Sequence, residues 1–339
     1  MGRYLNPGME SFEKSVNSEI YVDKTGLIGY TNRVMNTVQG YVCVSRPRRF
    51  GKSMAANMLT AYYSRGCDSR EIFSKFEISE SPDFEKYRNK YNTIFLNMQE
   101  FLSRSDSVEA LVDRVKKLVL RDLKREYPDV DYFDDTDLVE SMQDIYETEK
   151  CPFVVIIDEW DCIFREFRQN KEAQEKYLDF LRDLLKDKAC IHLAYMTGIL
   201  PIKKYGTHSA LNMFDEFSMI NPGPLAPYVG FTEVEVEYLC HKYRMDMEEV
   251  KAWYDGYSFS MAASVYSPRS VVNSMLFGKI ENYWNQTETF EALQVYIDMN
   301  FDSLKDDVLS MIAGERIPVN TGSFTNDMTT FRTEDDVLT

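Results

Sequence analysis

The feature that most constrains this chain is a short basic loop that closes on Gly51, Lys52 and Ser53. The loop follows the β-branched run at residues 40–45 and opens into good helix formers, so the local order is strand, turn, helix. Such a turn aims several backbone N–H groups at one point, and the helix N-terminus adds its positive dipole end. The stretch therefore predicts a phosphate-binding loop.

One position departs from the usual spacing G-x-x-x-x-G-K-S/T, because Arg46 stands where the first glycine belongs. The alternative is a basic turn that caps a helix and leaves Lys52 in solvent. If the stretch is a phosphate loop, Lys52 would neutralise the β- and γ-phosphates of ATP, and Ser53 would join the Mg²⁺ shell. The predicted nucleotide contacts are then Arg46, Pro47, Arg48, Arg49, Phe50, Gly51, Lys52, Ser53 and Met54.

A second motif is the apolar run at residues 153–157, which ends on Asp158 and Glu159. Asp158 is expected to hold Mg²⁺ beside Ser53, and Glu159 to polarise the attacking water as a general base. The alternative is a buried strand whose acids meet solvent at its tip. The two motifs together favour a nucleotide site, because the carboxyl ends of parallel strands converge where ligands bind.

Thr197, at the end of the apolar run "CIHLAYMTG", is a third catalytic candidate. Its hydroxyl would contact the γ-phosphate or its water, and a plain strand-terminal turn is the equal alternative. The loop arginines would embrace phosphates or reach a partner, although on a basic loop a solvated arginine is the commoner state.

The wider pattern alternates short apolar runs with amphipathic helical segments, such as residues 107–127. This alternation predicts an α/β fold, a parallel sheet sandwiched by helices. The expected strands lie at residues 41–45, 92–97, 153–158 and 190–196.

The Pro- and Gly-rich stretch "NPGPLAPYVGF" marks a hinge after residue 220, and aromatic-rich helical segments follow it. We therefore expect a small helical lid. The predicted divisions are a leader at 1–35, a core at 36–220, the lid at 221–300 and the start of a truncated C-terminal region at 301–339.

Composition excludes several classes of protein. The net charge of −16 makes direct nucleic-acid binding by this chain alone unfavourable. The six cysteines show no C-x-x-C spacing, so we expect reduced thiols rather than zinc. No apolar run approaches the roughly eighteen residues of a membrane span, and the start lacks the apolar core of a signal peptide. A cytoplasmic protein is expected.

Seven stretches resemble, in order, those of the bacterial AAA-ATPase-like family. They are YVDKT at 21–25, SRPRRFGKS at 45–53, VVIIDEWD at 154–161, MTGI at 196–199, GFTEVEV at 230–236, WYDGYSF at 253–259 and VYSPRSVVN at 265–273. The resemblance implies a P-loop NTPase core of the additional-strand type followed by a small helical lid domain. It also implies that arginine is the usual residue at position 46.

Members of that family usually continue into a C-terminal nuclease-like domain of the PD-(D/E)XK type. This sequence stops at Thr339, near where such a domain would begin, and shows no D…E-x-K set, so no nuclease activity is expected of it. The resemblance also suggests that the leader, with Asp23 and Lys24, packs near the adenine. The motif WYDGY has two interpretations: a tight turn that packs its aromatic side chains into the lid, or a recognition surface.

The leading hypothesis is a Mg²⁺-dependent ATPase whose nucleotide state moves the lid and signals to a partner domain or protein. Two alternatives stay open: a nucleotide-binding scaffold with little hydrolysis, and an ATPase module that serves a nucleic-acid-acting effector. The sequence leaves oligomer formation open.

Overall fold

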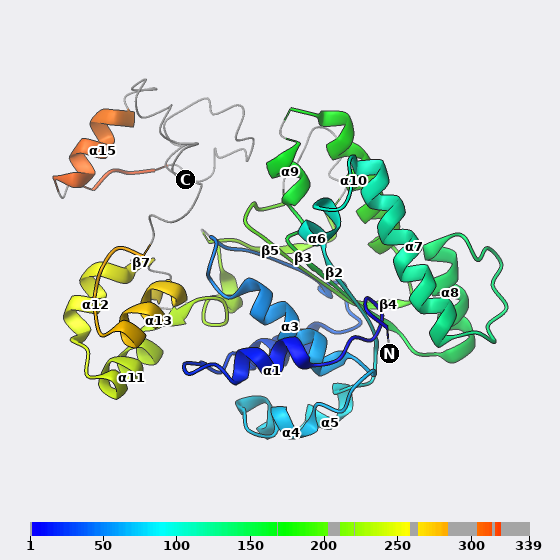
Figure 1. The fold of residues 1–339 in the computed structure, drawn as a ribbon, viewed down its shortest axis with the longest axis horizontal. Coiled ribbons are helices and arrows are strands. Elements are labelled where there is room, and N and C mark those ends of the chain that lie inside the picture. Colours follow the sequence, from blue (N-terminus) through cyan, green and yellow to red (C-terminus); the bar gives the residue numbers. More distant parts are fainter. Residues whose placement is uncertain are drawn as a thin grey trace.

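The computed structural model describes residues 2–167, 169–202, 211–219, 221–257, 264–283, 304–313 and 316–319. At its centre is a five-stranded sheet with the order β2-β3-β4-β1-β5, in which all neighbouring strands are parallel (Figure 1). The strands are β1 (Tyr41–Ser45), β2 (Asn92–Asn97), β3 (Phe153–Asp158), β4 (Ile191–Gly198) and β5 (Asp215–Phe217).

The position of β4 identifies the type of sheet, because β4 lies between β1, which precedes the basic loop, and β3, which ends on Asp158. This is the additional-strand arrangement of P-loop NTPases, so the expected fold class is confirmed. Four strands were predicted, although β4 runs two residues further than expected, to Gly198. β5 was not predicted.

Helices cover both faces of the sheet, as predicted (Figure 1). One face carries α6 (Met98–Leu102), α7 (Val108–Glu126), α8 (Leu138–Glu149), α9 (Cys162–Glu166) and α10 (Lys171–Leu185). The other carries α1 (Glu10–Val16), α2 (Gly26–Val34), α3 (Lys52–Tyr63), α4 (Arg70–Phe73), η1 (Glu77–Glu80) and α5 (Phe84–Tyr87).

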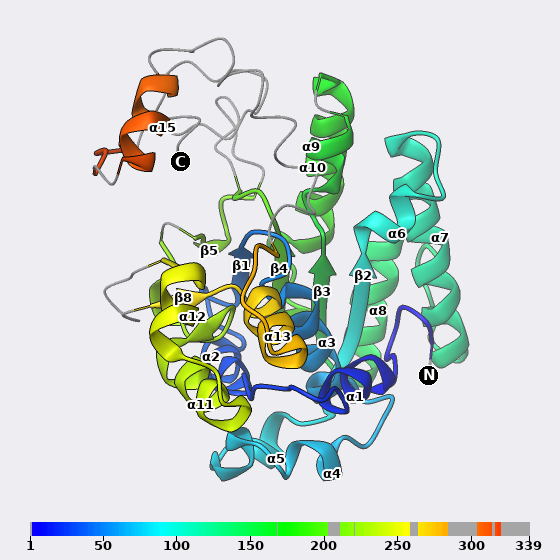
Figure 2. The ribbon, with the colours of Figure 1, turned by 60° about the vertical axis from the view of Figure 1, so that its left-hand side comes forward.

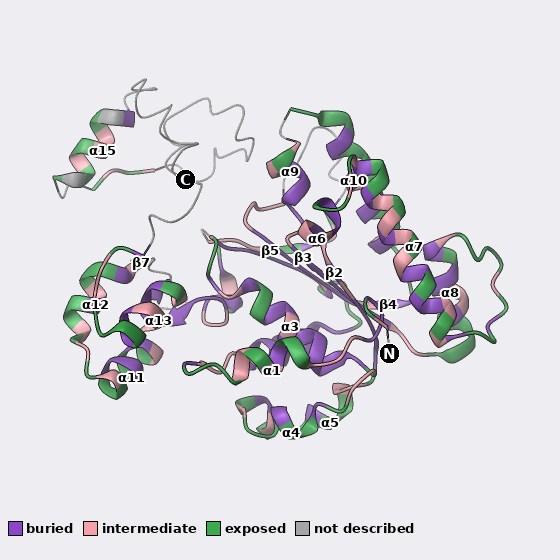
Figure 3. Ribbon diagram, viewed as in Figure 1, coloured by how far each residue is buried: buried purple, intermediate pink, exposed green. Residues whose placement is uncertain are grey.

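The alternation of side chains along β3 divides the interior into two cores. Phe153, Val155 and Ile157 belong to the core under α7 and α10, whereas Val154 and Ile156 belong to the core under α3. All five are fully buried, which explains why this strand reads as a continuous apolar run (Figure 3).

The first 35 residues are folded onto the core rather than set apart from it. Leu5 forms an antiparallel bridge with Ile94 of β2, and Phe12 of α1 is buried and stacks on Phe73. α2 adds Leu27 and Ile28 to the same core. The leader therefore contributes to both cores of the sheet, since Leu5 belongs to the core under α7 and α10.

A small unit follows β5 and has its own apolar core, which also includes Ile20 from the leader. It contains α11 (Glu233–Tyr243), α12 (Met247–Tyr254) and α13 (Pro268–Phe277), which confirms the predicted helical region. A three-stranded antiparallel sheet with the order β6-β8-β7 was not predicted. Its strands are β6 (Phe231–Thr232), β7 (Asp255–Tyr257) and β8 (Val265–Tyr266), and they do not join the main sheet.

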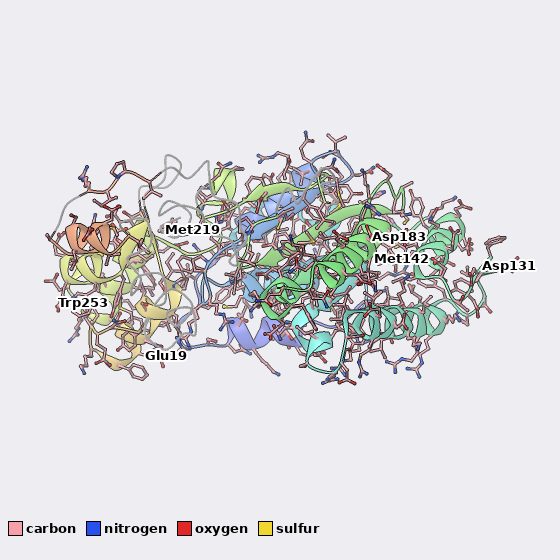
Figure 4. The ribbon with its side chains drawn as sticks, turned by 90° about the horizontal axis from the view of Figure 1, so that it is seen from above. Glu19, Asp131, Met142, Asp183, Met219 and Trp253 are labelled. Carbon is pink, nitrogen blue, oxygen red and sulfur yellow. The ribbon has the colours of Figure 1, made fainter. Side chains whose placement is uncertain are left out.

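The small unit lies beside the end of the main sheet that carries β1 and β5 (Figure 2). Seen from above, Trp253 and Asp131 mark opposite ends of the molecule, and Met219 lies between the small unit and the core (Figure 4). The connecting segment contains η2 (Gly223–Leu225), and its Leu225 and Val229 pack into the core under α3. The segment predicted as a hinge is therefore packed, at Leu225 and Val229, against the core under α3. Its movement stays a prediction.

Other predicted features have mixed outcomes. In WYDGYSF at 253–259, Tyr254 is buried at the end of α12, Trp253 is 52% exposed, and Asp255 begins β7, while Ser258 and Phe259 lie outside the described residues. α15 (Leu304–Ile312) is the one helix described in the predicted region 301–339, most of which lies outside the described residues. All six cysteines are free thiols. No helix within the described part is long and apolar enough to cross a membrane.

Candidate functional site

The loop between β1 and α3 is built around two left-handed backbone positions. Arg49 has φ of 70° and Gly51 has φ of 88°, and Gly51 caps the N-terminus of α3. A Cβ placed on Gly51 would meet no described atom within 4 Å, so the loop is open on that side. A glycine at this position both relieves backbone strain and leaves room for a ligand to approach the N-terminus of α3.

Lys52 is 5% exposed, and its Nζ donates to the carbonyl of Pro47 at 2.9 Å. Burial lowers the pKa of this ammonium group, and the nearby carboxylates of Glu159, Asp161 and Asp158 oppose the shift. The lysine is thus a buried cation held by the carbonyl of its own loop and surrounded by acids from the end of β3. This arrangement excludes the interpretation of Lys52 as a solvated residue in a basic turn.

Asp158 is also buried, at the last position of β3. Its Oδ2 accepts a hydrogen bond from Asn97 Nδ2 at 3.2 Å, whereas its Oδ1 has no hydrogen-bond partner among the described residues. Burial raises the pKa of the carboxyl to about 6, and the Ser53 hydroxyl and the Lys52 ammonium oppose that shift. A buried carboxylate oxygen without a donor is the expected state of a ligand for a cation.

These groups fit Mg²⁺ held in the usual manner of nucleotide sites. No cluster of three or more His, Cys, Asp or Glu side chains suited to a metal occurs in the described part of the chain. Mg²⁺ is commonly bound through one or two protein groups, with waters and substrate phosphates completing the octahedron. Asp158 and the exposed Ser53 would be those protein groups.

Glu159 follows Asp158 at a sharp turn, with φ of 55°. Its Oε2 lies 2.5 Å from Nη2 of Arg165, and its side chain is 23% exposed. The carboxylate therefore lies at the carboxyl end of β3 within the field of Lys52, in an ion pair that the sequence reading missed.

Thr197 pairs in register with Asp158 on one side and with Val44 on the other. It lies at the strand end, as expected, but it is fully buried, and its hydroxyl donates to the carbonyl of Val44 at 3.2 Å. In this structure the Thr197 side chain ties β4 to β1, and its contact with a γ-phosphate stays a prediction.

Arg46, at the position of the missing glycine, is 1% exposed. Its Nη1 donates to the carbonyls of Ser45 at 2.9 Å and Phe217 at 2.8 Å, and its backbone N–H donates to Gly198 at 3.1 Å. Burial lowers the pKa of the guanidinium to about 10. Arg46 therefore joins the ends of β1, β4 and β5, and its side-chain bond to β5 is one that no glycine could make.

The remaining loop residues divide into exposed and buried groups. Arg48, Arg49, Ser53 and Met54 are exposed, and Pro47 is partly buried. Phe50 is 1% exposed and belongs to the core under α3, together with Val229 and Val265. A Cβ placed on Gly230 would lie 3.4 Å from Phe50 Cδ1, so the loop touches the start of the small unit.

Three residues of the site were missed from the sequence: Asn97, Asp161 and Arg165. Asn97 follows an apolar run, and its end position on β2 was a usable signal because β2 lies beside β3. Asp161 and Arg165 have the i,i+4 spacing of a helical ion pair, and they lie 3.4 Å apart between Oδ2 and Nε.

The two leader residues predicted near the adenine contact protein groups. Lys24 Nζ lies 2.5 Å from Oε2 of Glu235 on α11. Asp23 accepts hydrogen bonds from the backbone N–H groups of Thr25 and Glu77. Their proximity to a base stays a prediction.

A comparison with protein families decides the membership of this chain. The AAA-ATPase-like family, described as predicted AAA-ATPases, matches residues 6–207, which is more than half of the 339 residues. The chain belongs to the AAA-ATPase-like family. The match includes the basic loop, both carboxylates of the β3 end and Thr197, and it stops before the small unit.

The AAA-ATPase-like chain is 25% identical over 297 residues to an uncharacterized protein in the vnfD 5′ region of Azotobacter chroococcum mcd 1. That alignment covers 83% of this chain and 54% of the relative, so the chain spans about half the length of the curated relative it matches.

Two solved structures that contain ATP analogues align with this chain. The Aeropyrum pernix ORC2 protein, in ADPNP-ADP complexes, aligns over 90% of this chain and 72% of its own, with 12% identity and a TM-score of 0.39. The replication initiator DnaA, bound to AMPPCP and single-stranded DNA, aligns over 95% of this chain and 78% of its own, with 9% identity and a TM-score of 0.37. Both TM-scores lie below 0.5, so neither structure gives a residue-level correspondence to this AAA-ATPase-like chain.

Proposed function

We propose that this chain binds ATP with Mg²⁺ in the loop between β1 and α3 and hydrolyses it. The observation that carries the proposal is the pairing of a buried ammonium, Lys52, with a buried carboxylate, Asp158, whose Oδ1 lacks a donor. Each ion is costly to bury without a partner. A magnesium nucleotide would satisfy both, since its phosphates face the lysine and its cation faces the aspartate.

The protein groups would divide the work of binding. Lys52 exchanges the carbonyl of Pro47 for the β- and γ-phosphates, and the first N–H groups of α3 point at the same anion. Ser53 and Asp158 would hold Mg²⁺, and the cation would supply neutralisation of the charge on the phosphate oxygens. Arg48 and Arg49, which are exposed, would meet the remaining phosphate charge.

Glu159 would act as the general base. It accepts a proton from the water whose oxygen bonds to the γ-phosphorus, and ADP leaves with the electron pair of the broken P–O bond. Thr197, at the neighbouring strand end, would contact the γ-phosphate. Its hydroxyl also donates to the carbonyl of Val44, so this contact would connect the phosphate to β1.

The small unit is the part that the nucleotide state would move. Contacts among the described residues join it to the site region: Phe50 of the loop lies against Gly230, and Lys24 binds Glu235. A shift of the loop on binding or hydrolysis would therefore reach α11, and the position of the small unit would signal to a partner domain or protein.

Two substitutions separate binding from hydrolysis. Lys52→Ala removes the cation that faces the phosphates, so ATP affinity should fall by about 1 to 3 kcal/mol, measured by calorimetry with Mg²⁺. Glu159→Gln keeps the shape of the side chain, so affinity should persist while phosphate release falls about a hundredfold or more.

Matched controls are Lys117→Ala on α7 and Glu175→Gln on α10, two exposed residues that should leave both readouts unchanged. Equal ATP affinity in wild type and Lys52→Ala would contradict the binding site. Undiminished turnover in Glu159→Gln would remove Glu159 from the mechanism. Repeating the turnover assay with DNA or RNA tests for a nucleic-acid-acting role.

A further inference from the structure

Arg165 of α9 contacts two acids of the turn that follows β3. Its Nη2 lies 2.5 Å from Oε2 of Glu159, and its Nε lies 3.4 Å from Oδ2 of Asp161. The Arg165 side chain is 13% exposed, and that of Asp161 is fully buried. Arg165 and Asp161 are thus largely withdrawn from water, so the geometry of their pair is more fixed than that of a surface pair.

Asp161 is anchored in turn by the backbone that follows β4. Its Oδ2 accepts hydrogen bonds from the N–H groups of Ile199 at 3.1 Å and Leu200 at 2.9 Å. A Cβ placed on Gly198 would lie 2.6 Å from Oδ1 of Asp161, so only glycine allows this approach. The position of Asp161 is therefore set by the residues immediately beyond Thr197.

The same stretch of backbone is tied to the strand that carries the loop. The Ser45 hydroxyl donates to the carbonyl of Leu200 at 3.2 Å, and the N–H of Ile202 donates to Glu216 of β5 at 2.6 Å. A continuous set of contacts thus runs from the end of β1, through residues 199–202 and Asp161, to Arg165 and Glu159.

Glu159 needs such a support because a glutamate side chain has three rotatable bonds and is partly exposed here. A base for water attack must be held close to one geometry, since a misplacement of about 1 Å is worth about a hundredfold in rate. Contact with Arg165 fixes one carboxylate oxygen and leaves the other to accept a proton.

We propose that Arg165 is a positioning residue that holds Glu159 in the geometry for water activation and links it, through Asp161, to the backbone beyond β4. This inference rests on the proposed ATPase function and adds a residue to it. Arg165 acts through Glu159 and forms no contact with phosphate in this scheme.

The test compares the steady-state kinetics of Arg165→Met and Arg165→Lys with those of wild type. Arg165→Met should lower kcat about 10- to 100-fold while KM for Mg²⁺-ATP stays within about twofold. Arg165→Lys should recover part of the loss, because an ammonium reaches one acid but cannot span both. The control is Arg182→Met on α10, which removes an arginine from an exposed pair with Asp179 and should change neither constant.

A double mutant separates positioning from a general structural effect. If Arg165 acts through Glu159, adding Arg165→Met to Glu159→Gln should lower kcat no further. A further fall equal to that seen in wild type would overturn the inference, and so would a wild-type or raised kcat in Arg165→Met. If Arg165→Met fails to fold, judged by its thermal midpoint, Arg165→Lys supports the same comparison.

Different results would contradict the proposed hydrolysis and the proposed role of Arg165. A wild-type chain that binds Mg²⁺-ATP without turning it over contradicts the proposed hydrolysis and the role of Arg165 with it. A wild-type chain that turns over ATP, together with an unaffected Arg165→Met, contradicts the role of Arg165 alone.

Discussion

Lys24 and Glu235 form an ion pair that joins the segment before α2 to the first turn of α11, with Nζ 2.5 Å from Oε2. Lys24 Nζ also donates to the carbonyl of Pro227 at 2.7 Å. Glu235 accepts in addition the N–H of Thr232 at 2.7 Å, as part of the capping box of α11. One carboxylate therefore both starts the helix and attaches it to the core.

Lys24→Met should loosen the small unit. Its side chain and that of Glu235 are 14% and 24% exposed, so removing the cation leaves a largely buried carboxylate without its partner. The expected loss of stability is about 1 to 3 kcal/mol. Hydrogen exchange should show faster exchange at residues 229–243 and unchanged exchange in β3.

The control for that change is Lys251→Met. Lys251 lies on α12 and pairs with Glu233 of α11, the helix that also carries Glu235. Its side chain is 42% exposed, so its loss should change stability by less than about 1 kcal/mol. Equal effects of the two substitutions would mean that Lys24 contributes no more than a surface ion pair.

Gly51→Ala should reduce ATP affinity by more than its effect on folding. Its φ of 88° makes any side chain unfavourable, at about 1 to 2 kcal/mol of stability, and the added methyl enters the open side of the loop. Gly278→Ala is the matched control, because Gly278 has φ of 62° and an equally open Cβ position at the end of α13. Calorimetry should show an affinity at least about tenfold weaker for Gly51→Ala, and an unchanged affinity for Gly278→Ala despite a similar loss of stability.

Asp158→Asn should stabilise the nucleotide-free protein in a pH-dependent manner. Burial raises the pKa of Asp158 from 3.8 to about 6, so the group favours the folded state when protonated and loses that contribution as the pH rises through 6. The asparagine variant does not ionise, so its advantage should be absent at pH 4 and reach about 1 to 3 kcal/mol at pH 7.

Chemical denaturation at several pH values, without nucleotide, measures this difference. Asp183→Asn on α10 provides the comparison, since its carboxyl group is exposed. If the gain in stability of Asp158→Asn does not change with pH, ionisation of Asp158 does not destabilise the folded protein, and the prediction is wrong.

Arg46→Gly, which restores the usual glycine of a phosphate loop, should damage the protein. It removes the donor to the carbonyls of Ser45 and Phe217 and empties a buried volume. The expected loss of stability is about 2 to 4 kcal/mol, against less than about 1 kcal/mol for Arg49→Met at an exposed position of the same loop. Thermal and denaturant unfolding of both variants would decide, and equal stability of Arg46→Gly and wild type would contradict the tie between β1 and β5.

The sequence predicted the four long strands because each is an apolar run buried on both faces of a parallel sheet. It did not predict β5, since Asp215, Glu216 and Phe217 have no strand pattern and are held by pairing to β1 and by Arg46. The small antiparallel sheet was missed for a similar reason, because β6 and β8 have two residues each. Such short strands are set by tertiary contacts that a local pattern does not show.

The candidate site was predicted in part for the same physical reason. Lys52 and Asp158 follow apolar strands, and a parallel sheet brings those strand ends together. The burial of Arg46 could not be read from its neighbours in sequence, since its acceptor on β5 is 171 positions away. The support of Glu159 by Arg165 was also hidden, because it depends on how α9 turns back toward the end of β3.

The contact between Phe50 and Gly230 limits how the chain can be recombined. Gly230 has φ of 117°, and a Cβ there would lie 2.4 Å from Val265 Cγ1 and 3.4 Å from Phe50 Cδ1. A graft that exchanges residues 230–283 for those of another chain must therefore keep the glycine, the valine and the loop aromatic together. Since Leu225 and Val229 pack into the core, the segment before Gly230 should travel with the recipient core. A chimera joined at residue 221 instead would carry the donor's residues 225 and 229 into the recipient core.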